Sequence, residues 1–213
     1  MEHNNDKLVN MNLAEFVELL ASEAPAPGGG SASALAGAVG SALVSMVSNL
    51  TLNNKKYAQH ENVMRELLTQ TKNLHQKFIA LIDEDTAAFN GVSAVFAMPK
   101  DTDEQKAIRS KALQDALKNC VIPPFEMMVC AKNALELFED KIDKFNENAT
   151  SDLGVAALSL KTAMQGAWLN ILINIGSIKD EEFATRYRKE GEELLANALP
   201  IADRIYETIS SSY

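Results

Sequence analysis

Asp85 is the residue of this chain that most clearly suggests chemistry. It lies in the apolar stripe of a predicted long helix, four residues after Leu81 and four before Phe89. Burial of a carboxylate without a partner costs several kcal/mol or raises its pKa until the group is neutral. Asp85 is therefore either one half of a structural ion pair or a site residue, and a partly buried carboxylate suits proton transfer and the stabilisation of a cation.

Four further polar residues are candidates for the same kind of work. Asp152 follows Ser151 at a predicted helix start, where it either caps the helix or supplies a second acid. Lys161 is alone among uncharged residues of that helix and is a possible partner for a buried acid. Asn170 and Asn174 are four residues apart and share one helix face, so their amides either satisfy backbone groups or bind a heterocycle.

A glycine-rich segment precedes a helix of small residues. The segment from Pro25 to Ser31 contains Gly28, Gly29 and Gly30, and no charged residue occurs between Ala24 and Asn54. Backbone N–H groups at a helix N-terminus suit an anionic or carbonyl group, and glycines let a ligand approach the backbone. The alternative is a flexible entry into a tightly packed core helix.

The elements that must position these residues are all predicted to be helices, since no strand-like alternation occurs. We predict helices over 12–22, 31–52, 57–97, 101–121, 123–138, 151–178, 180–198 and 200–211. The first and fourth of these are expected to be capped by Asn12 with Glu15 and by Asp101 with Glu104, and the fifth to have Pro123 and Pro124 in its first turn. Pro200 is expected to separate the last two helices. The sequence thus predicts an all-α, single-domain bundle of seven or eight helices over residues 1–213, with residues 1–9 as a flexible tail.

Composition excludes several functional classes. The 213 residues are 46% hydrophobic and 23% charged, as in globular proteins, and the net charge of −9 argues against nucleic-acid binding. The uncharged stretches 24–54 and 162–178 are too polar or too broken to span a membrane, so we expect a soluble, cytoplasmic protein. Cys120 and Cys130 are expected to be reduced and structural, and the three histidines form no metal motif.

Three blocks of sequence together resemble the cyclodeaminase/cyclohydrolase family of folate enzymes. They are APAPGGGSASALAGAVGSALVSMVSNLT followed by NKKY, then DEDTAAFNGVSAVFAMPK, then NATSDLGVAALSLKTAMQGAWLNILIN. The resemblance extends from about Leu13 to the last helices. It implies an all-helical homodimer that acts on tetrahydrofolate one-carbon units, without a metal or a tightly bound cofactor. Either of two activities follows: closure of 5-formiminotetrahydrofolate with loss of ammonia, or hydration of 5,10-methenyltetrahydrofolate to 10-formyltetrahydrofolate.

The resemblance also implies roles for the candidate acids and the glycine segment. Asp85 fits best as the catalytic acid or base, and Asp152 is the second candidate for that role. The two acids can also divide the work, one in catalysis and the other in binding the N–H groups of the pterin ring. Gly28, Gly29, Gly30 and Ser31 would let the backbone approach the substrate.

The remaining candidates have more general roles in substrate binding. Lys55 and Lys56 are expected to contact the acidic tail of a folate, which can be polyglutamylated, although a solvated turn explains them equally well. Asn170 and Asn174 would bind pterin edges, and Lys161 would steady an acid or the tail. The competing hypothesis is a non-catalytic helical dimer that binds a small ligand or a partner protein. It is supported by a stripe of small residues on one helix face, formed by Ser33, Gly37, Ser41 and Ser45, which would let another helix pack closely.

Overall fold

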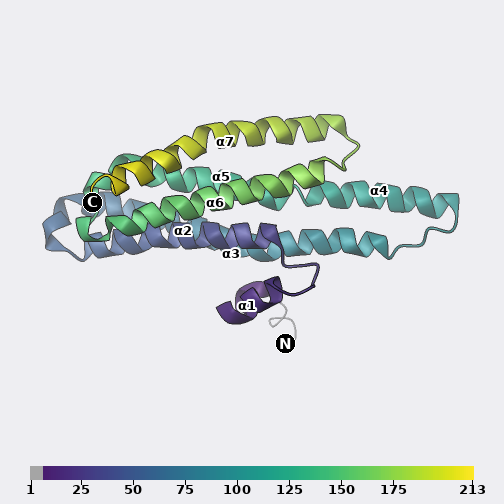
Figure 1. Ribbon diagram of the computed structural model, residues 1–213, viewed down its shortest axis with the longest axis horizontal. Helices are drawn as coiled ribbons and strands as arrows, with labels where there is room; N and C mark the ends of the chain where they lie inside the picture. The colour runs from purple at the N-terminus through teal and green to yellow at the C-terminus, as the bar shows by residue number, and fades with distance from the viewer. Residues whose placement is uncertain (1–6) are drawn as a thin grey trace.

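The computed structural model of the chain describes residues 7–213, and these residues contain helices but no strand (Figure 1). The α-helices are α1 (Leu13–Leu20), α2 (Gly29–Leu52), α3 (Glu61–Phe96), α4 (Asp103–Asn119), α5 (Ile122–Phe138), α6 (Thr150–Ile175) and α7 (Glu181–Ser210). Short 3₁₀ helices are η1 (Leu8–Asn10), η2 (Lys55–His60), η3 (Glu139–Lys144) and η4 (Glu147–Ala149). The predicted all-α fold is confirmed.

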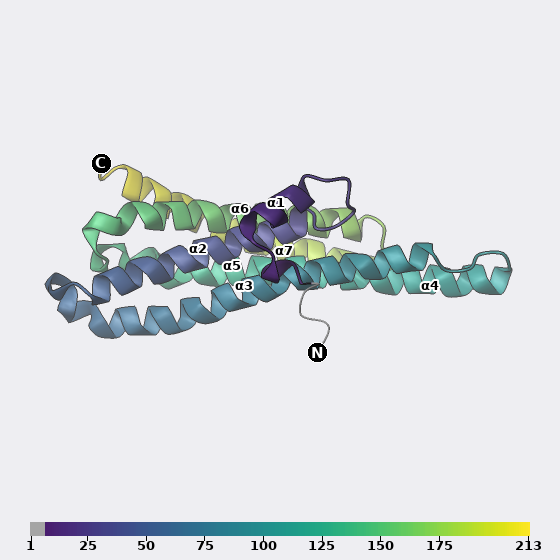
Figure 2. The same cartoon turned by 90° about the horizontal axis from the view of Figure 1, so that it is seen from below.

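Four long helices, α2, α3, α5 and α6, pack around a common apolar core, and α7 covers α5 and α6. The end of α3 and the first part of α4 extend past the other helices at one end of the molecule (Figure 2), while the last turns of α4 lie beside the C-terminal end of α6, where Gln114 Nε2 donates to the Ser177 carbonyl. Within the bundle α2 and α6 are antiparallel, because Gly29 lies beside Asn170 and Gly40 lies beside Leu160. This pairing decides which helix ends meet at the candidate site.

The small residues of α2 allow its neighbours to approach closely. A Cβ atom added at Gly40 would lie 3.0 Å from the Ala156 carbonyl oxygen, and one added at Gly37 would lie 2.2 Å from the Phe78 ring. Larger side chains at these positions would push α2 away from α6 and α3. α2 is therefore a tightly packed core helix, as the alternative interpretation of this segment required.

Most predicted helix boundaries agree with the structure. Asn12 forms the expected capping box with Glu15 at the start of α1, and α5 begins at Ile122 with prolines in its first turn. Three starts differ from the prediction by two residues or more. α2 begins at Gly29, two residues early, and α3 begins at Glu61, four residues late, because Lys55–His60 form the 3₁₀ helix η2. α4 begins at Asp103, two residues late, and its capping box is made by Thr102 and Gln105 rather than by Asp101 and Glu104.

The predicted break at Pro200 is wrong, because α7 is continuous through it. Proline removes the N–H that would bond to the carbonyl of Ala196. Both Ala196 and Pro200 are exposed, so water can satisfy that carbonyl. On the other face Ala198 and Ile201 are buried on either side of the proline, and this continuous apolar contact holds the helix together.

The predicted tail over 1–9 falls partly outside the described residues, which begin at residue 7. Leu8–Asn10 form a 3₁₀ helix, and the Leu8 backbone N–H donates to Asp83 Oδ1 of α3 at 2.8 Å.

α2 is long and apolar enough to span a membrane by length and composition alone. This is weak evidence for a membrane span, since 44% of its most apolar 18-residue stretch is buried inside the bundle, as in a core helix.

Candidate active site

Asp85 reaches from α3 to the first turn of α2. Its Oδ2 atom accepts a hydrogen bond from the Ser31 hydroxyl at 3.1 Å, and the Ser31 backbone N–H also bonds to the carboxylate. The N-cap residue of α2 is Gly28, which has no side chain to cap the helix. Asp85 therefore serves as a cap supplied by another helix, and the helix dipole favours its negative charge.

Gly30 makes this contact possible. A Cβ atom at Gly30 would lie 2.1 Å from Asp85 Oδ1 and 2.4 Å from its Cγ. The PGGGS segment thus provides space for a carboxylate directly against the helix backbone, where the sequence alone indicated space for a ligand.

Burial and hydrogen bonding act on Asp85 in opposite directions. Desolvation raises the pKa of the carboxyl above its ordinary value, and the two hydrogen bonds from Ser31 lower it by less. The net effect is a raised pKa. A carboxyl tuned in this way both accepts and returns protons more readily near neutral pH than an exposed aspartate does.

Asn170 and Asn174 bring acceptor atoms to the same place from α6. Asn170 Nδ2 donates to the Gly166 carbonyl at 2.9 Å, and Asn174 Nδ2 donates to the Asn170 carbonyl at 2.7 Å. Asn174 Nδ2 also lies 3.4 Å from the Cys120 carbonyl oxygen. Because the NH₂ groups are used in this way, the Oδ1 atoms, which accept no hydrogen bond from any described residue, are left to accept from a ligand.

These residues line a cavity of about 170 Å³. Its lining consists of Pro25, Ala26, Gly28, Gly29, Gly30, Asp85, Thr86, Phe89, Cys120, Asn170 and Asn174. Among the described residues this lining includes no Lys, Arg or His, so its fixed charge comes from Asp85. Burial and the charge of Asp85 raise the pKa of Cys120 to about 11, which makes this thiol a poor nucleophile at neutral pH. The cavity therefore favours a cationic ligand with N–H donors.

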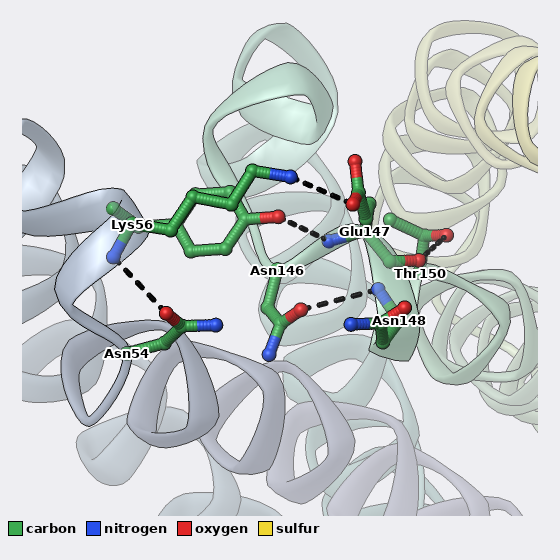
Figure 3. Close-up of polar contacts among 7 residues, drawn as sticks. Asn54, Lys56, Asn146, Glu147, Asn148 and Thr150 are labelled. Carbon is green, nitrogen blue, oxygen red and sulfur yellow. Dashed lines mark hydrogen bonds and ion pairs between the residues drawn. The ribbon is translucent and has the colours of Figure 1, made fainter.

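Lys55, Lys56 and Asp152 do not lie near Asp85 within this chain. Lys56 follows the far end of α2 and pairs with Glu147 at 2.7 Å, as Figure 3 shows. Asp152 is in the first turn of α6, eighteen residues before Asn170, which corresponds to about 27 Å along the helix. Ala149 is the N-cap of α6 and makes no side-chain cap.

Lys161 is also engaged away from the cavity. Its ammonium group pairs with Asp203 of α7, whose side chain is half exposed. Lys161 therefore has an acidic partner, as the sequence suggested. That partner, Asp203, is neither of the two candidate site acids. Its role in substrate binding stays a prediction.

A larger cavity, of about 840 Å³, lies at the opposite end of the bundle. It is lined by the Lys56–Glu147 pair, by other acidic side chains that include Asp143, and by Tyr57 and Tyr213. We assign the candidate site to the smaller cavity, because there a carboxylate with a raised pKa faces amide oxygens that accept no hydrogen bond from a described residue.

Five residues of the cavity lining were not among the sequence candidates: Pro25, Ala26, Thr86, Phe89 and Cys120. Thr86 and Phe89 follow Asp85 by one and four residues, and the helical spacing of Phe89 places it on the same face of α3. That spacing is the signal that would have identified it. Cys120 ends α4, and no sequence pattern places that end beside α2. No cluster of three or more metal-binding side chains occurs in residues 7–213.

Comparison with known proteins identifies the family. The formiminotransferase-cyclodeaminase family model matches residues 12–193. A methenyltetrahydrofolate cyclohydrolase of Methylorubrum extorquens is 40% identical over 95% of this chain and 97% of its own length. The formimidoyltransferase-cyclodeaminase of Rattus norvegicus is 31% identical over 90% of this chain, which spans about a third of that longer protein.

A solved structure also matches the fold. The formiminotetrahydrofolate cyclodeaminase of Thermotoga maritima superimposes with a TM-score of 0.85 at 27% sequence identity. The match covers 96% of this chain and 98% of the other. Since the family model covers most of the sequence and the relatives match nearly its full length, the chain belongs to the formiminotransferase-cyclodeaminase family.

Proposed function

We propose that this protein is a soluble, cytoplasmic methenyltetrahydrofolate cyclohydrolase whose catalytic base is Asp85. The observation that carries the proposal is the cavity: a carboxylate with a raised pKa faces two amide oxygens, and none of the described residues that line the cavity is cationic. Such a cavity stabilises a cation, and the methenyl carbon lies in a cationic amidinium group. The 40% identity to a cyclohydrolase along nearly its whole length favours hydration over ring closure.

The proposed reaction balances in two steps. In the first, the oxygen of water bonds to the methenyl carbon, and Asp85 accepts one proton from that water. In the second, the bond between the carbon and N5 breaks, and Asp85 returns its proton to N5. The hydroxyl proton leaves to solvent as the carbonyl of 10-formyltetrahydrofolate forms. The substrate carries the reacting group, so the proposal needs neither a metal nor a tightly bound cofactor.

The acceptor atoms suggest how the pterin is held. We propose that Asn170 and Asn174 accept hydrogen bonds from pterin N–H groups through their Oδ1 atoms. The cavity of about 170 Å³ is smaller than the roughly 300–1,000 Å³ of a typical ligand pocket, so much of the folate must lie outside it. Lys55 and Lys56 are proposed contacts for its glutamate tail, polyglutamylated or not, if a second copy brings them to the site.

The activity can be tested by following the absorbance of 5,10-methenyltetrahydrofolate with the purified protein. We expect the absorbance to decay faster than in buffer alone. Parallel reactions with 5-formiminotetrahydrofolate are expected to release no ammonia. Ammonia release with growth of the methenyl absorbance would instead make the protein a cyclodeaminase, and no reaction in either assay would favour a non-catalytic binding protein.

We also propose that the protein is a homodimer joined through one face of α2 and α6, here named the α2/α6 face. Its exposed apolar residues are Val39, Met46, Leu50, Val155, Leu158, Leu169 and Ile173. The face is about 36 Å long and two helices wide, which gives roughly 700 Å², close to the area that one partner buries in a standard interface. Since the chain carries a charge of −9, two copies repel each other least where neither presents charges.

A charge placed on this face should separate the copies. We expect light scattering to report a dimer for the native protein and a monomer for Leu158→Glu, because the new carboxylate would be buried against an apolar partner. Ile108→Glu is the matched control: Ile108 is 54% exposed on α4, away from the α2/α6 face, and its variant should stay dimeric. A native protein that is monomeric at micromolar concentration would exclude the proposed dimer.

A further inference from the structure

Ser31 has more hydrogen-bond partners than it has protons. Its Oγ atom lies 3.1 Å from Asp85 Oδ2, 3.1 Å from the Ile82 carbonyl oxygen and 3.0 Å from Thr86 Oγ1. The side chain is completely buried, and these three partners all belong to α3. A hydroxyl donates a single hydrogen, so Ser31 cannot donate to Asp85 and Ile82 at once.

The two choices correspond to two protonation states of Asp85. When Asp85 is ionised, Ser31 donates to Oδ2, and the Thr86 hydroxyl can donate to Ser31. When Asp85 is protonated, its own O–H can donate to Ser31, which turns its hydrogen to the Ile82 carbonyl. In both arrangements every buried polar atom of the group has a partner, so protonation of Asp85 leaves no polar atom of the group unsatisfied.

We propose that Ser31 is a positioning residue that holds the Asp85 carboxyl in place in both of its protonation states, with Thr86 as the second hydroxyl of the hydrogen-bonded group. The proposal rests on the proposed function only in that Asp85 is the base. It assigns the Ser31 side chain to the protein rather than to the substrate, because a completely buried hydroxyl with three protein partners is not available to a ligand.

The surroundings of Asp85 contain few other groups that titrate. Among the described residues of the lining, Cys120 at the end of α4 is the other titratable group, and its pKa of about 11 keeps it neutral below pH 9. The first turn of α2 presents glycine backbone and Ser31, and α6 presents Asn170 and Asn174, all uncharged. A change in pH between 4 and 9 therefore acts on this group through Asp85.

The test is the titration of the Asp85 carboxyl by carbon-13 NMR in the native protein and in Ser31→Ala. Loss of a hydrogen bond to the charged form is expected to move the midpoint upward by about 1–2 pH units. Ser33→Ala is the matched control, because Ser33 is also buried on α2 but donates to the Gly29 carbonyl and does not contact Asp85. Its midpoint should not move.

Turnover separates this proposal from the proposed function. The acid limb of the kcat profile for methenyltetrahydrofolate should move upward in Ser31→Ala by the same interval as the NMR midpoint, with KM little changed. An NMR midpoint that moves without the kinetic limb would show that Asp85 is not the base. An unmoved NMR midpoint in a folded Ser31→Ala variant would overturn the positioning role. Thr86→Val, which removes the second hydroxyl but keeps Ser31, should give a smaller shift and provides the test if Ser31→Ala does not fold.

Discussion

Replacement of Asp85 with asparagine is expected to lower kcat by about 10²–10⁴-fold, the usual contribution of a positioned general acid or base. The amide keeps the shape of the side chain and can still accept from Ser31, so the cap on α2 is retained while proton transfer is lost. Steady-state hydration of 5,10-methenyltetrahydrofolate measures the effect. Near-native turnover would remove Asp85 from the catalytic role.

The same substitution is expected to raise thermal stability at pH 7. A carboxyl whose pKa is raised on folding stabilises the native state fully below its ordinary pKa of 3.8, and loses that contribution as the pH rises through the raised value. At neutral pH the buried charge is therefore a cost that asparagine removes. For a chain of this size, each kcal/mol of added stability raises Tm by about 2–4 °C, so thermal unfolding at pH 7 measures the gain.

Two comparisons make this result specific. The difference in Tm between Asp85→Asn and the native protein should shrink as the pH falls toward 3.5, where Asp85 is protonated. Asp83→Asn is the control for a general effect of lost charge, since Asp83 lies two residues away on α3 and accepts from the Leu8 N–H instead. It should keep its turnover, and equal losses of turnover in both variants would contradict the assignment.

Local signals in the sequence predicted the helices well. Asn12 with Glu15, and Pro123 with Pro124, act within one helical turn, and the structure uses them as expected. The break predicted at Pro200 was wrong because the rule that proline ends a helix is local, whereas tertiary packing decides whether α7 continues. The missing hydrogen bond lies on an exposed side of α7, and buried residues on the other side keep the helix continuous.

The candidate site was predictable from the glycine segment before α2 and from helical spacing. The position of Asp85 in an apolar stripe, and the shared face of Asn170 and Asn174, follow from a period of 3.6 residues. Lys55 and Asp152 were grouped with these residues, but the structure places them away from Asp85 within this chain. Spacing gives the face of a helix on which a residue lies, but not which helix ends meet. The antiparallel pairing of α2 and α6 decides that, and it results from close packing at small residues such as Gly40.

The second large effect is expected from Gly30→Ala. The added methyl carbon would lie 2.1 Å from Asp85 Oδ1, inside van der Waals contact, while the φ of Gly30 is not in the left-handed region and so imposes no strain of its own. The carboxyl must move away from Ser31, which lowers kcat by an expected factor of at least about 100 and costs about 1–3 kcal/mol of unfolding free energy. Turnover and urea unfolding measure the two effects.

Gly91→Ala shows why this result would be specific to the contact with Asp85. Gly91 is also a helical glycine, in α3, but an added Cβ meets no atom within 4 Å. Alanine there should stabilise the protein by about 0.5–1 kcal/mol through helix propensity, with turnover unchanged. The two glycines therefore predict opposite signs for the same chemical change. If Gly30→Ala were as stable and active as Gly91→Ala, the carboxylate would not need its place against the N-terminus of α2, and the proposed site geometry would be wrong.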